Sequence, residues 1–285
     1  MIVKHTIDDF NNLWQLSEAG KSANSKVFWA DIADNWISEF VSEEKGKPWV
    51  HHRVCATSNY LKQNDLINSK CSVVDIGCGP GLFVIEFAKT AKYAMGIDYS
   101  NRFIQYGRDV AKIQGIHNVE FCEYDFENID IDSMGLTGAF DLAFSCISGA
   151  ICSLESINKL MKMSHSWCYC SNFVSVNDSL IKAICYDIFG EHYKSHHNGT
   201  GFYSLFNILW LMGYRPETNY FVESHTEVIV PTWEKAQEFA NRCHHKTPEE
   251  TEKIFNWLNS HREIERKVEY AYGGILWDIR IKDGR

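Results

Sequence analysis

An acidic residue and three glycines lie close together between residues 75 and 81, where the sequence reads D-I-G-C-G-P-G. Glycine tolerates positive φ angles and lets a ligand come within contact distance of the backbone. The apolar run that contains Asp75 has strand character, and residues 82 to 89 have helical spacing, so the helix would offer unpaired N–H groups at its start. The stretch therefore predicts a strand, a tight turn and a helix that bind a small ligand against bare backbone.

The acid limits which ligand suits this turn. A dinucleotide-binding turn reads G-x-G-x-x-G and places a diphosphate at the start of the helix. Here Pro80 interrupts that spacing, and the Asp75 carboxylate would repel a diphosphate but attract an ammonium group. A second acid, Asp98, lies 23 residues after Asp75 at the end of the next predicted strand, where a carboxylate can accept hydrogen bonds from ribose hydroxyls. The pattern disfavours an NAD(P)-dependent oxidoreductase, which stays a weaker alternative.

Apolar runs that alternate with helical patterns predict an α/β fold with a parallel sheet and right-handed crossovers. Residues 1–70 are expected to form a helical cap, and residues 71–285 a core with a helical lid at about 190–262 before the final strand. The predicted strands are residues 73–76, 93–98, 118–126, 139–146, 167–176, 218–224 and 271–280.

Two helices in the second half carry end signals. Asp178 is expected to cap the start of one helix, and Gly190 to end it. A later helix opens with Thr247 as its N-cap, Pro248 in the first turn and Glu250 as the third helical residue, which together predict a capping box.

The turn, the two acids and two later segments, Tyr124-Asp125-Phe126 and 140–151, occur in the order and spacing of the motifs of class I S-adenosylmethionine (SAM) dependent methyltransferases. The chain resembles this family, and in particular uncharacterised small-molecule methyltransferases of anaerobic microbes. The resemblance implies a Rossmann-like seven-stranded sheet, mostly parallel with an antiparallel last strand, with helices on both faces. It also implies SAM as the cofactor and S-adenosylhomocysteine as its product.

The resemblance further implies a set of cofactor-binding residues. The glycine turn with Asp75 would hold the methionine end of SAM, Asp98 the ribose, and Asp125 the adenine amino group. Trp29, from the helical cap, is a further candidate for the wall of the site. The full set comprises Asp75, Gly77, Cys78, Gly79, Gly81, Asp98, Tyr99, Tyr124, Asp125, Phe126, Ser145, Cys146 and Trp29.

Composition excludes several other classes. The formal net charge of −9 provides no basic surface for phosphates, so nucleic acid is not an expected partner. No apolar stretch approaches the roughly 20 residues that a membrane-spanning helix needs, and the N-terminus lacks a signal sequence, so a cytoplasmic protein is expected. The ten cysteines are expected to be free thiols. Because Cys168, Cys170 and Cys243 lack the spacing of paired metal knuckles, no metal is expected.

The predicted reaction is an in-line transfer of the methyl group of SAM to a small molecule. Since the donor is already activated, the protein mainly aligns the reactants and excludes water, and a general base is optional. The lack of an obvious base leaves a non-catalytic SAM-binding or partner-binding protein as an alternative. Candidates for a base, which ordinary core or surface positions would also explain, are His51, His52, His196, His197 and Tyr203.

Overall fold

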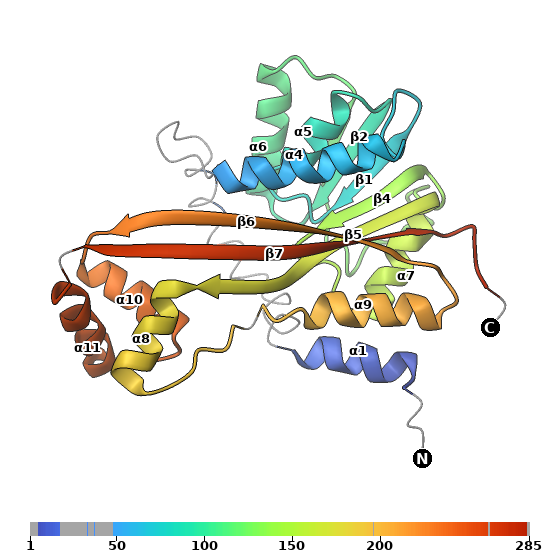
Figure 1. Ribbon diagram of the computed structural model, residues 1–285. Helices are drawn as coiled ribbons and strands as arrows, with labels where there is room; N and C mark the ends of the chain where they lie inside the picture. The colour runs from blue at the N-terminus through green and yellow to red at the C-terminus, as the bar shows by residue number, and fades with distance from the viewer. Residues whose placement is uncertain are drawn as a thin grey trace. The chain divides into compact units, whose positions relative to one another are not determined.

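The computed structural model describes residues 5–17, 33, 37, 48–195, 197–261 and 263–283, without the side chains of residues 48–51 (Figure 1). Helices and strands alternate through most of this range, as predicted. In chain order they are α1 (Ile7–Leu16), α4 (Pro48–Gln63), β1 (Ser72–Ile76), α5 (Leu82–Ala88), β2 (Tyr93–Asp98), α6 (Asn101–Ile113), β3 (Val119–Glu123), β4 (Phe140–Cys146), α7 (Leu154–Met163), β5 (Ser164–Asp178), α8 (Ser179–Phe189), α9 (Thr200–Leu211), β6 (Glu217–Ile229), α10 (Trp233–Arg242), α11 (Pro248–Asn259) and β7 (Ile264–Asp278).

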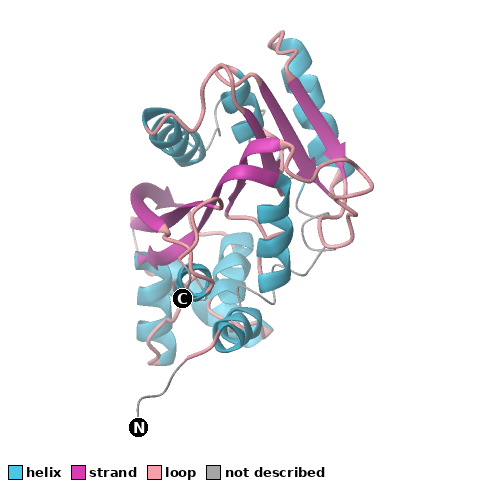
Figure 2. Ribbon diagram, turned by 90° about the vertical axis from the view of Figure 1, so that its right-hand side faces the viewer, coloured by secondary structure: helices cyan, strands magenta, loops and turns pink. Residues whose placement is uncertain are grey.

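The strands form one seven-stranded sheet in the order β3-β2-β1-β4-β5-β7-β6 (Figures 1 and 2). The pairs β1–β2, β2–β3, β1–β4 and β4–β5 are parallel. The last strand, β7, runs against the others in Figure 1. This arrangement confirms the predicted fold class, a mostly parallel Rossmann-like sheet with an antiparallel last strand. The carboxyl ends of β1, β2 and β4 therefore meet at one edge, where the predicted site residues lie.

The chain divides into two compact units. The first comprises residues 1–174, 199–221 and 272–285, and the second comprises residues 175–198 and 222–271. In the first unit, Val74 and Ile76 of β1 contact a core that includes α7 and α9, whereas Val73 points to a second core that includes α4 and α5. Figure 1 shows these helix pairs on opposite faces of the sheet. None of the helices within the described ranges has the length and apolar character that a bilayer span requires.

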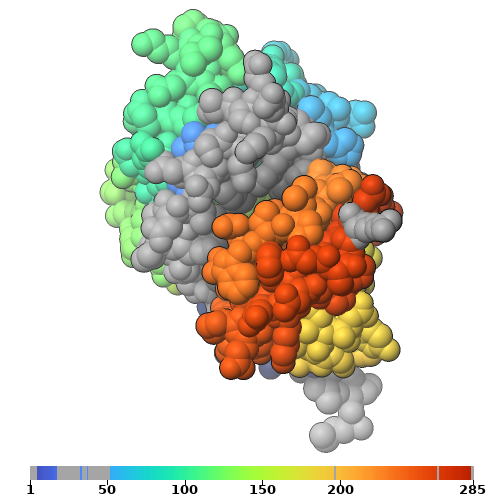
Figure 3. Space-filling model, turned by 90° about the vertical axis from the view of Figure 1, so that its left-hand side faces the viewer, coloured from blue at the N-terminus to red at the C-terminus, as the bar shows by residue number. Residues whose placement is uncertain are grey.

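The second unit has a core of its own, made by α8, α10, α11 and the strand segments beside them. Figure 3 shows α10 and α11 as one continuous orange and red surface. Both predicted helix ends are confirmed here: Asp178 accepts the N–H groups of Leu180 and Ile181, and Gly190 ends α8 with a φ of 67°. The capping box between Thr247 and Glu250 is also confirmed. The predicted cap and lid boundaries remain a proposal.

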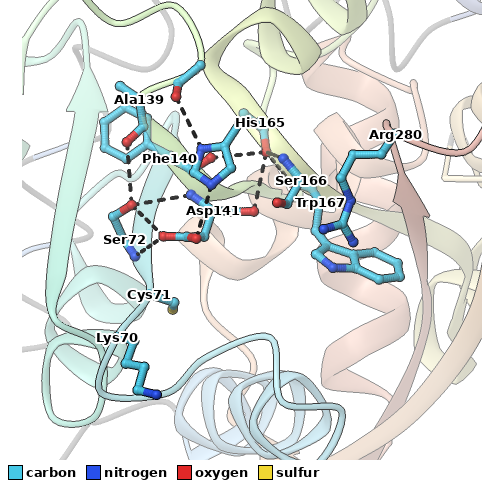
Figure 4. A network of polar contacts seen from close by, with 12 residues as sticks. Lys70, Cys71, Ser72, Ala139, Phe140, Asp141, His165, Ser166, Trp167 and Arg280 are labelled. Carbon is cyan, nitrogen blue, oxygen red and sulfur yellow. Dashed lines mark hydrogen bonds and ion pairs between the residues drawn. The ribbon is translucent and has the colours of Figure 1, made fainter.

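A polar network joins the starts of β1, β4 and β5 at the opposite edge of the sheet from the glycine turn (Figure 4). The Asp141 carboxylate accepts 2.8 Å hydrogen bonds from the hydroxyl and the N–H of Ser72. The His165 ring lies between the other Asp141 oxygen and the Gly138 carbonyl, at 3.1 Å from each. Burial alone would raise the pKa of Asp141, but the Ser72 and His165 contacts outweigh it and lower the pKa. The network fixes the amino ends of three parallel strands.

In the second unit, a histidine joins the end of α8 to the start of α11. His245 Nδ1 lies 2.9 Å from Glu250, and Nε2 lies 3.3 Å from Glu191. Its ring stacks on Phe189, with 3.6 Å between centroids and 8° between planes. Because carboxylates only accept hydrogen bonds, a ring nitrogen of His245 that carries hydrogen can donate to the carboxylate beside it.

These contacts predict an acid-sensitive contribution to stability. The hydrogen bond from His245, followed by those from Thr247, lowers the pKa of Glu250 from 4.5 to about 2. A carboxyl group with a depressed folded pKa stabilises the fold above its unfolded pKa, and this contribution is lost as pH falls through the folded value. We therefore expect the difference in melting temperature between the protein and its Glu250→Gln variant to shrink from pH ~5 to pH ~2. The control, Glu249→Gln, should show a constant difference; a constant difference for Glu250→Gln would contradict the assignment.

Candidate active site

The glycine turn adopts the predicted geometry. Gly77, Gly79 and Gly81 all have positive φ angles, of 69°, 53° and 80°. The N–H groups of Gly77 and Cys78 donate to the Ile97 carbonyl, at 2.8 and 3.1 Å, which fixes the turn to the end of β2. A Cβ atom placed on Gly79 would meet no heavy atom of the described residues within 4 Å. Open space therefore lies beside the middle of the turn, where a ligand can approach the backbone.

Two buried carboxylates lie beside this turn. Asp75 is 2% exposed and Asp98 is 8% exposed. Asp98 accepts hydrogen bonds from the N–H groups of Gly79 and Ser100, each at 2.9 Å. Burial raises the pKa of Asp75 well above its usual value, and the charge of Asp98 raises it further. Burial also raises the pKa of Asp98, although backbone N–H groups oppose this.

Buried acids are costly unless a partner compensates them. Across the described ranges, no lysine, arginine or histidine forms an ion pair with Asp75 or Asp98. A carboxylate can accept about four hydrogen bonds, so Asp98 keeps capacity beyond the backbone N–H groups of Gly79, Tyr99 and Ser100. The pair thus suits a ligand that brings a positive charge to Asp75 and hydroxyl groups to Asp98.

Ser100 is the N-cap residue of α6, but its side chain makes no capping hydrogen bond.

The segment predicted for adenine follows β3, which ends at Glu123 and not at residue 126 as predicted. Asp125 is half-buried, and its carboxylate accepts hydrogen bonds from the Glu127 N–H at 3.2 Å and the Asn128 side chain at 2.7 Å. Tyr124 is 41% exposed, whereas Phe126 is 5% exposed and belongs to the core. Tyr99 is half-buried after β2. Tyr124 thus keeps a larger accessible ring surface for a ligand than Phe126 does.

At the end of β4, the two predicted residues are engaged within the protein. The Ser145 hydroxyl donates to the Ile76 carbonyl at 2.9 Å, and Cys146 Sγ accepts from the Ser171 hydroxyl at 2.9 Å. The next residue, Ile147, has a φ of 49°. Such an angle is a genuine outlier for a β-branched residue, and strain of this kind concentrates at functional sites.

The strained turn brings Ser148 against the glycine turn. Its hydroxyl would lie 1.8 Å from a Cβ placed on Gly77, so Gly77 must be glycine for Ser148 to occupy this position. Ser148 was not among the predicted site residues. Its only sequence signal is its place directly after the fourth predicted strand, and the contact depends on the backbone angle of Ile147.

The candidate bases are distributed over several elements. His52 is exposed on α4, and Tyr203 is 54% exposed on α9, with its ring edge-on to Phe10 at 5.6 Å. His197 is half-buried in the second unit, where its N–H donates to Ser195. The side chain of His51, together with His196 and Trp29, lies outside the described residues. No base is assigned on this geometry.

The middle of β7 passes close to a buried tyrosine. A Cβ on Gly274 would lie 2.0 Å from the Tyr169 hydroxyl oxygen and 2.4 Å from Asn219 Oδ1. Tyr169 is fully buried, so its ring has no room to move. A glycine in a strand interior often marks such a close approach.

Gly274→Ala is therefore expected to destabilise the protein by about 1–3 kcal/mol through overpacking. Chemical denaturation would measure this loss. The matched control is Gly273→Ala, whose Cβ would meet the half-buried Phe202 ring at 2.5 Å. Because the Phe202 ring is less buried than Tyr169, the control should lose less stability; equal losses would argue against the Tyr169 contact as the cause.

Comparisons with known proteins agree with this arrangement. Residues 67–191 match the model of a family described as a methyltransferase domain. Human EEF1A lysine methyltransferase 2 is 34% identical over 85 residues, covering 28% of this chain and 36% of that protein, so the match spans about a third of the relative's length.

Solved structures share the fold at low sequence identity. The YcgJ protein from Bacillus subtilis has a TM-score of 0.50 and 12% identity, covering 79% of this chain and 98% of that chain. Magnesium protoporphyrin IX methyltransferase from Synechocystis PCC 6803, solved with bound SAH, has a TM-score of 0.47 and 15% identity, covering 88% of this chain and 96% of that chain.

Proposed function

Because residues 67–191 belong to the class I SAM-dependent methyltransferases, we propose that the chain transfers the methyl group of SAM to a small-molecule acceptor. The observation that carries this proposal is the pair of buried acids, Asp75 and Asp98, for which the described chain supplies no cation. SAM carries an ammonium group and a ribose, which match the charge and the hydrogen-bonding capacity of these two side chains.

Each part of the site has a proposed task. Asp75 would pair with the ammonium group, while the open backbone at Gly79 would allow close contact with the methionine portion. Asp98 would accept from the ribose hydroxyls, and Asp125 would use its remaining lone pairs for the adenine amino group. SAM would supply an activated methyl group on a sulfonium. The protein then contributes alignment and exclusion of water, which together account for much of the catalysis in such transfers.

Support for a small acceptor comes from the residues beside Asp75. Phe144 and Tyr169 on the next two strands stack with 5.4 Å between centroids and 3° between planes, and Tyr60 on α4 lies 6.3 Å from Tyr169. Phe144 and Tyr169 are fully buried, so these rings make the surroundings of Asp75 apolar and aromatic, as around sites for small organic molecules. A second candidate is a protein lysine, because the human relative is by name a lysine methyltransferase.

An isotope experiment separates these functions. The protein would be incubated with SAM tritiated on its methyl group. One sample would contain a metabolite extract freed of proteins, and the other a protein extract freed of metabolites. We expect the label in the small-molecule fraction. Label found only in the protein fraction would mean that the acceptor is a protein and not a small molecule. SAM binding without any transfer would favour a non-catalytic SAM-binding protein. Absence of SAM binding by calorimetry would overturn the proposal.

A further inference from the structure

A row of polar side chains on α4 faces strands β5 and β7 of the sheet. Arg53, Thr57 and Tyr60 are spaced four and three residues apart, so they share one face of the helix. The Arg53 guanidinium lies over the Tyr272 ring of β7, 6.0 Å from its centroid. Tyr60 lies beside Tyr169 of β5. Thr57, between them in the row, must therefore face the same part of the sheet.

Two polar atoms in this region are buried without a partner in the described chain. Thr57 is 0% exposed, and its hydroxyl makes no hydrogen bond with any described residue. The Asn219 Nδ2 atom on β6 is likewise shielded from solvent and unbonded within that range. The other Asn219 atom, Oδ1, accepts a long 3.5 Å hydrogen bond from Tyr169 and no other from the described residues. A buried polar group without a hydrogen-bond partner is costly, so two such groups in one region point to a missing partner.

Strand register places this region beside the methyl donor. Asp75 pairs with Phe144, and Phe144 pairs with Tyr169, in one row across three parallel strands. Neighbouring strands lie about 4.8 Å apart, so the Tyr169 backbone lies about 10 Å from that of Asp75. Val73, Phe144 and Tyr169 all contribute to the core that includes α4 and α5, and Asp75, two residues after Val73, points to the same face. An acceptor next to bound SAM would thus extend over this row.

The groups gathered here are hydrogen-bond donors. Burial raises the pKa of Tyr60, and the charge of Glu217 raises it further. Burial also raises the pKa of Tyr169. Both phenols therefore keep their protons. Tyr169 donates its proton to Asn219 Oδ1, so the groups that can offer hydrogens to a ligand are the Tyr60 hydroxyl, the Thr57 hydroxyl and the Asn219 amide. A ligand that suits them presents an oxygen with free lone pairs and no proton.

We propose that Thr57 and Asn219 bind a carboxylate or carbonyl oxygen of the methyl acceptor; this inference rests on the proposed methyltransferase function. The two side chains determine which acceptors bind, and take no part in the transfer itself. Tyr169 orients the Asn219 amide by donating to Oδ1, which directs Nδ2 toward the ligand. The contact between Tyr169 and Asn219 is possible because Gly274, which lies beside both atoms, has no side chain.

Binding of matched small probes tests the proposal. Benzoate and benzyl alcohol differ mainly in whether they carry a carboxylate, and ligand-detected NMR in the presence of S-adenosylhomocysteine measures their affinities. We expect benzoate to bind at millimolar concentration and more tightly than benzyl alcohol. Thr57→Val and Asn219→Asp keep the side-chain shapes but remove the hydroxyl and the amide donor, and each should weaken benzoate binding by about tenfold.

Ser204→Ala is the matched control, because this serine on α9 is also 0% exposed with an unbonded hydroxyl in the described chain, but it lies outside the proposed subsite. It should leave benzoate affinity unchanged. Equal benzoate affinity in all variants, or no binding of benzoate, would overturn the inference and indicate that only a buried water occupies the region. SAM binding in the same samples reports on the proposed function separately: a protein that binds SAM but not benzoate contradicts this inference alone.

Discussion

Asp98→Ala is expected to weaken SAM binding at least tenfold, a loss on the order of 1.4 kcal/mol or more. The variant removes the proposed acceptor for the ribose hydroxyls. It also removes the partner of the Gly79 N–H, which is bonded to Asp98 at 2.9 Å and holds the middle of the glycine turn. Both effects act on the same ligand, because the turn and the carboxylate face one site. Calorimetric titration with SAM measures the change.

Two further variants make this result interpretable. Asp98→Asn keeps the size and one oxygen, so it should bind SAM more tightly than Asp98→Ala. Asp109→Ala removes an exposed acid from α6 and should leave SAM affinity unchanged. Thermal melting of each variant checks that it is folded. If folded Asp98→Ala bound SAM as tightly as the unchanged protein, the ribose assignment would be wrong.

Much of the first half of the fold was predictable because β1, β2 and β4 are buried on both faces. Such strands read as short continuous apolar runs, and an acid at the end of a run stands out against them. This is why the positions of Asp75 and Asp98 followed from the sequence. The turn glycines were equally visible, since positive φ angles restrict the choice of residue.

The second half was harder to predict for a physical reason. Predicted strands at 218–224 and 271–280 correspond to much longer ones, β6 and β7, which extend over 217–229 and 264–278. The added part of β7 reads I-E-R-K-V-E, which resembles a charged surface segment. Its alternate residues Glu265 and Lys267 are exposed, but Arg266 between them is buried. Arg266 is buried beside Asp178 and Glu227, with which it forms ion pairs. These partners are 88 and 39 residues away in the sequence, so the local sequence pattern does not predict the pairs.

Several residues of the candidate site were also not predictable from the sequence, because their positions depend on contacts between distant parts of the chain. The positions of Ser148 and Thr57 depend on a strained backbone angle and on a helix row, respectively. Serine and threonine are common in both loops and helices, so their types carried no signal. Asn219 became a candidate for binding the acceptor because Tyr169, 50 residues earlier, extends past Gly274 and donates to it. Acids and glycines mark a cofactor site from sequence, whereas the residues that select an acceptor emerge from tertiary contacts.

Arg266→Ala is expected to cause the largest loss of stability, about 3–5 kcal/mol, because it removes the nearest cation from the buried carboxylate of Asp178. The Arg266 guanidinium donates to Asp178 at 2.6 and 3.1 Å and to Glu227 at 2.7 Å, and it lies over the Phe239 ring at 5.4 Å. It thereby joins β7 to the start of α8, to β6 and to α10. Asp178 is 1% exposed and also caps α8, so loss of its closest cation would weaken the helix start as well.

Urea denaturation followed by circular dichroism would measure this loss. The control is Arg242→Ala, since Arg242 contacts the same Asp178 at 3.5 Å but its side chain is 34% exposed. A partly solvated pair of this kind contributes about 1 kcal/mol or less, so the control should remain close to the unchanged protein. Arg266→Ala combined with Asp178→Asn should recover part of the loss, because the second change removes the unpaired charge while keeping an oxygen to cap α8. If Arg266→Ala and Arg242→Ala were equally mild, the buried ion pair would not stabilise the second unit, and its apolar core around α8, α10 and α11 would have to account for that stability alone.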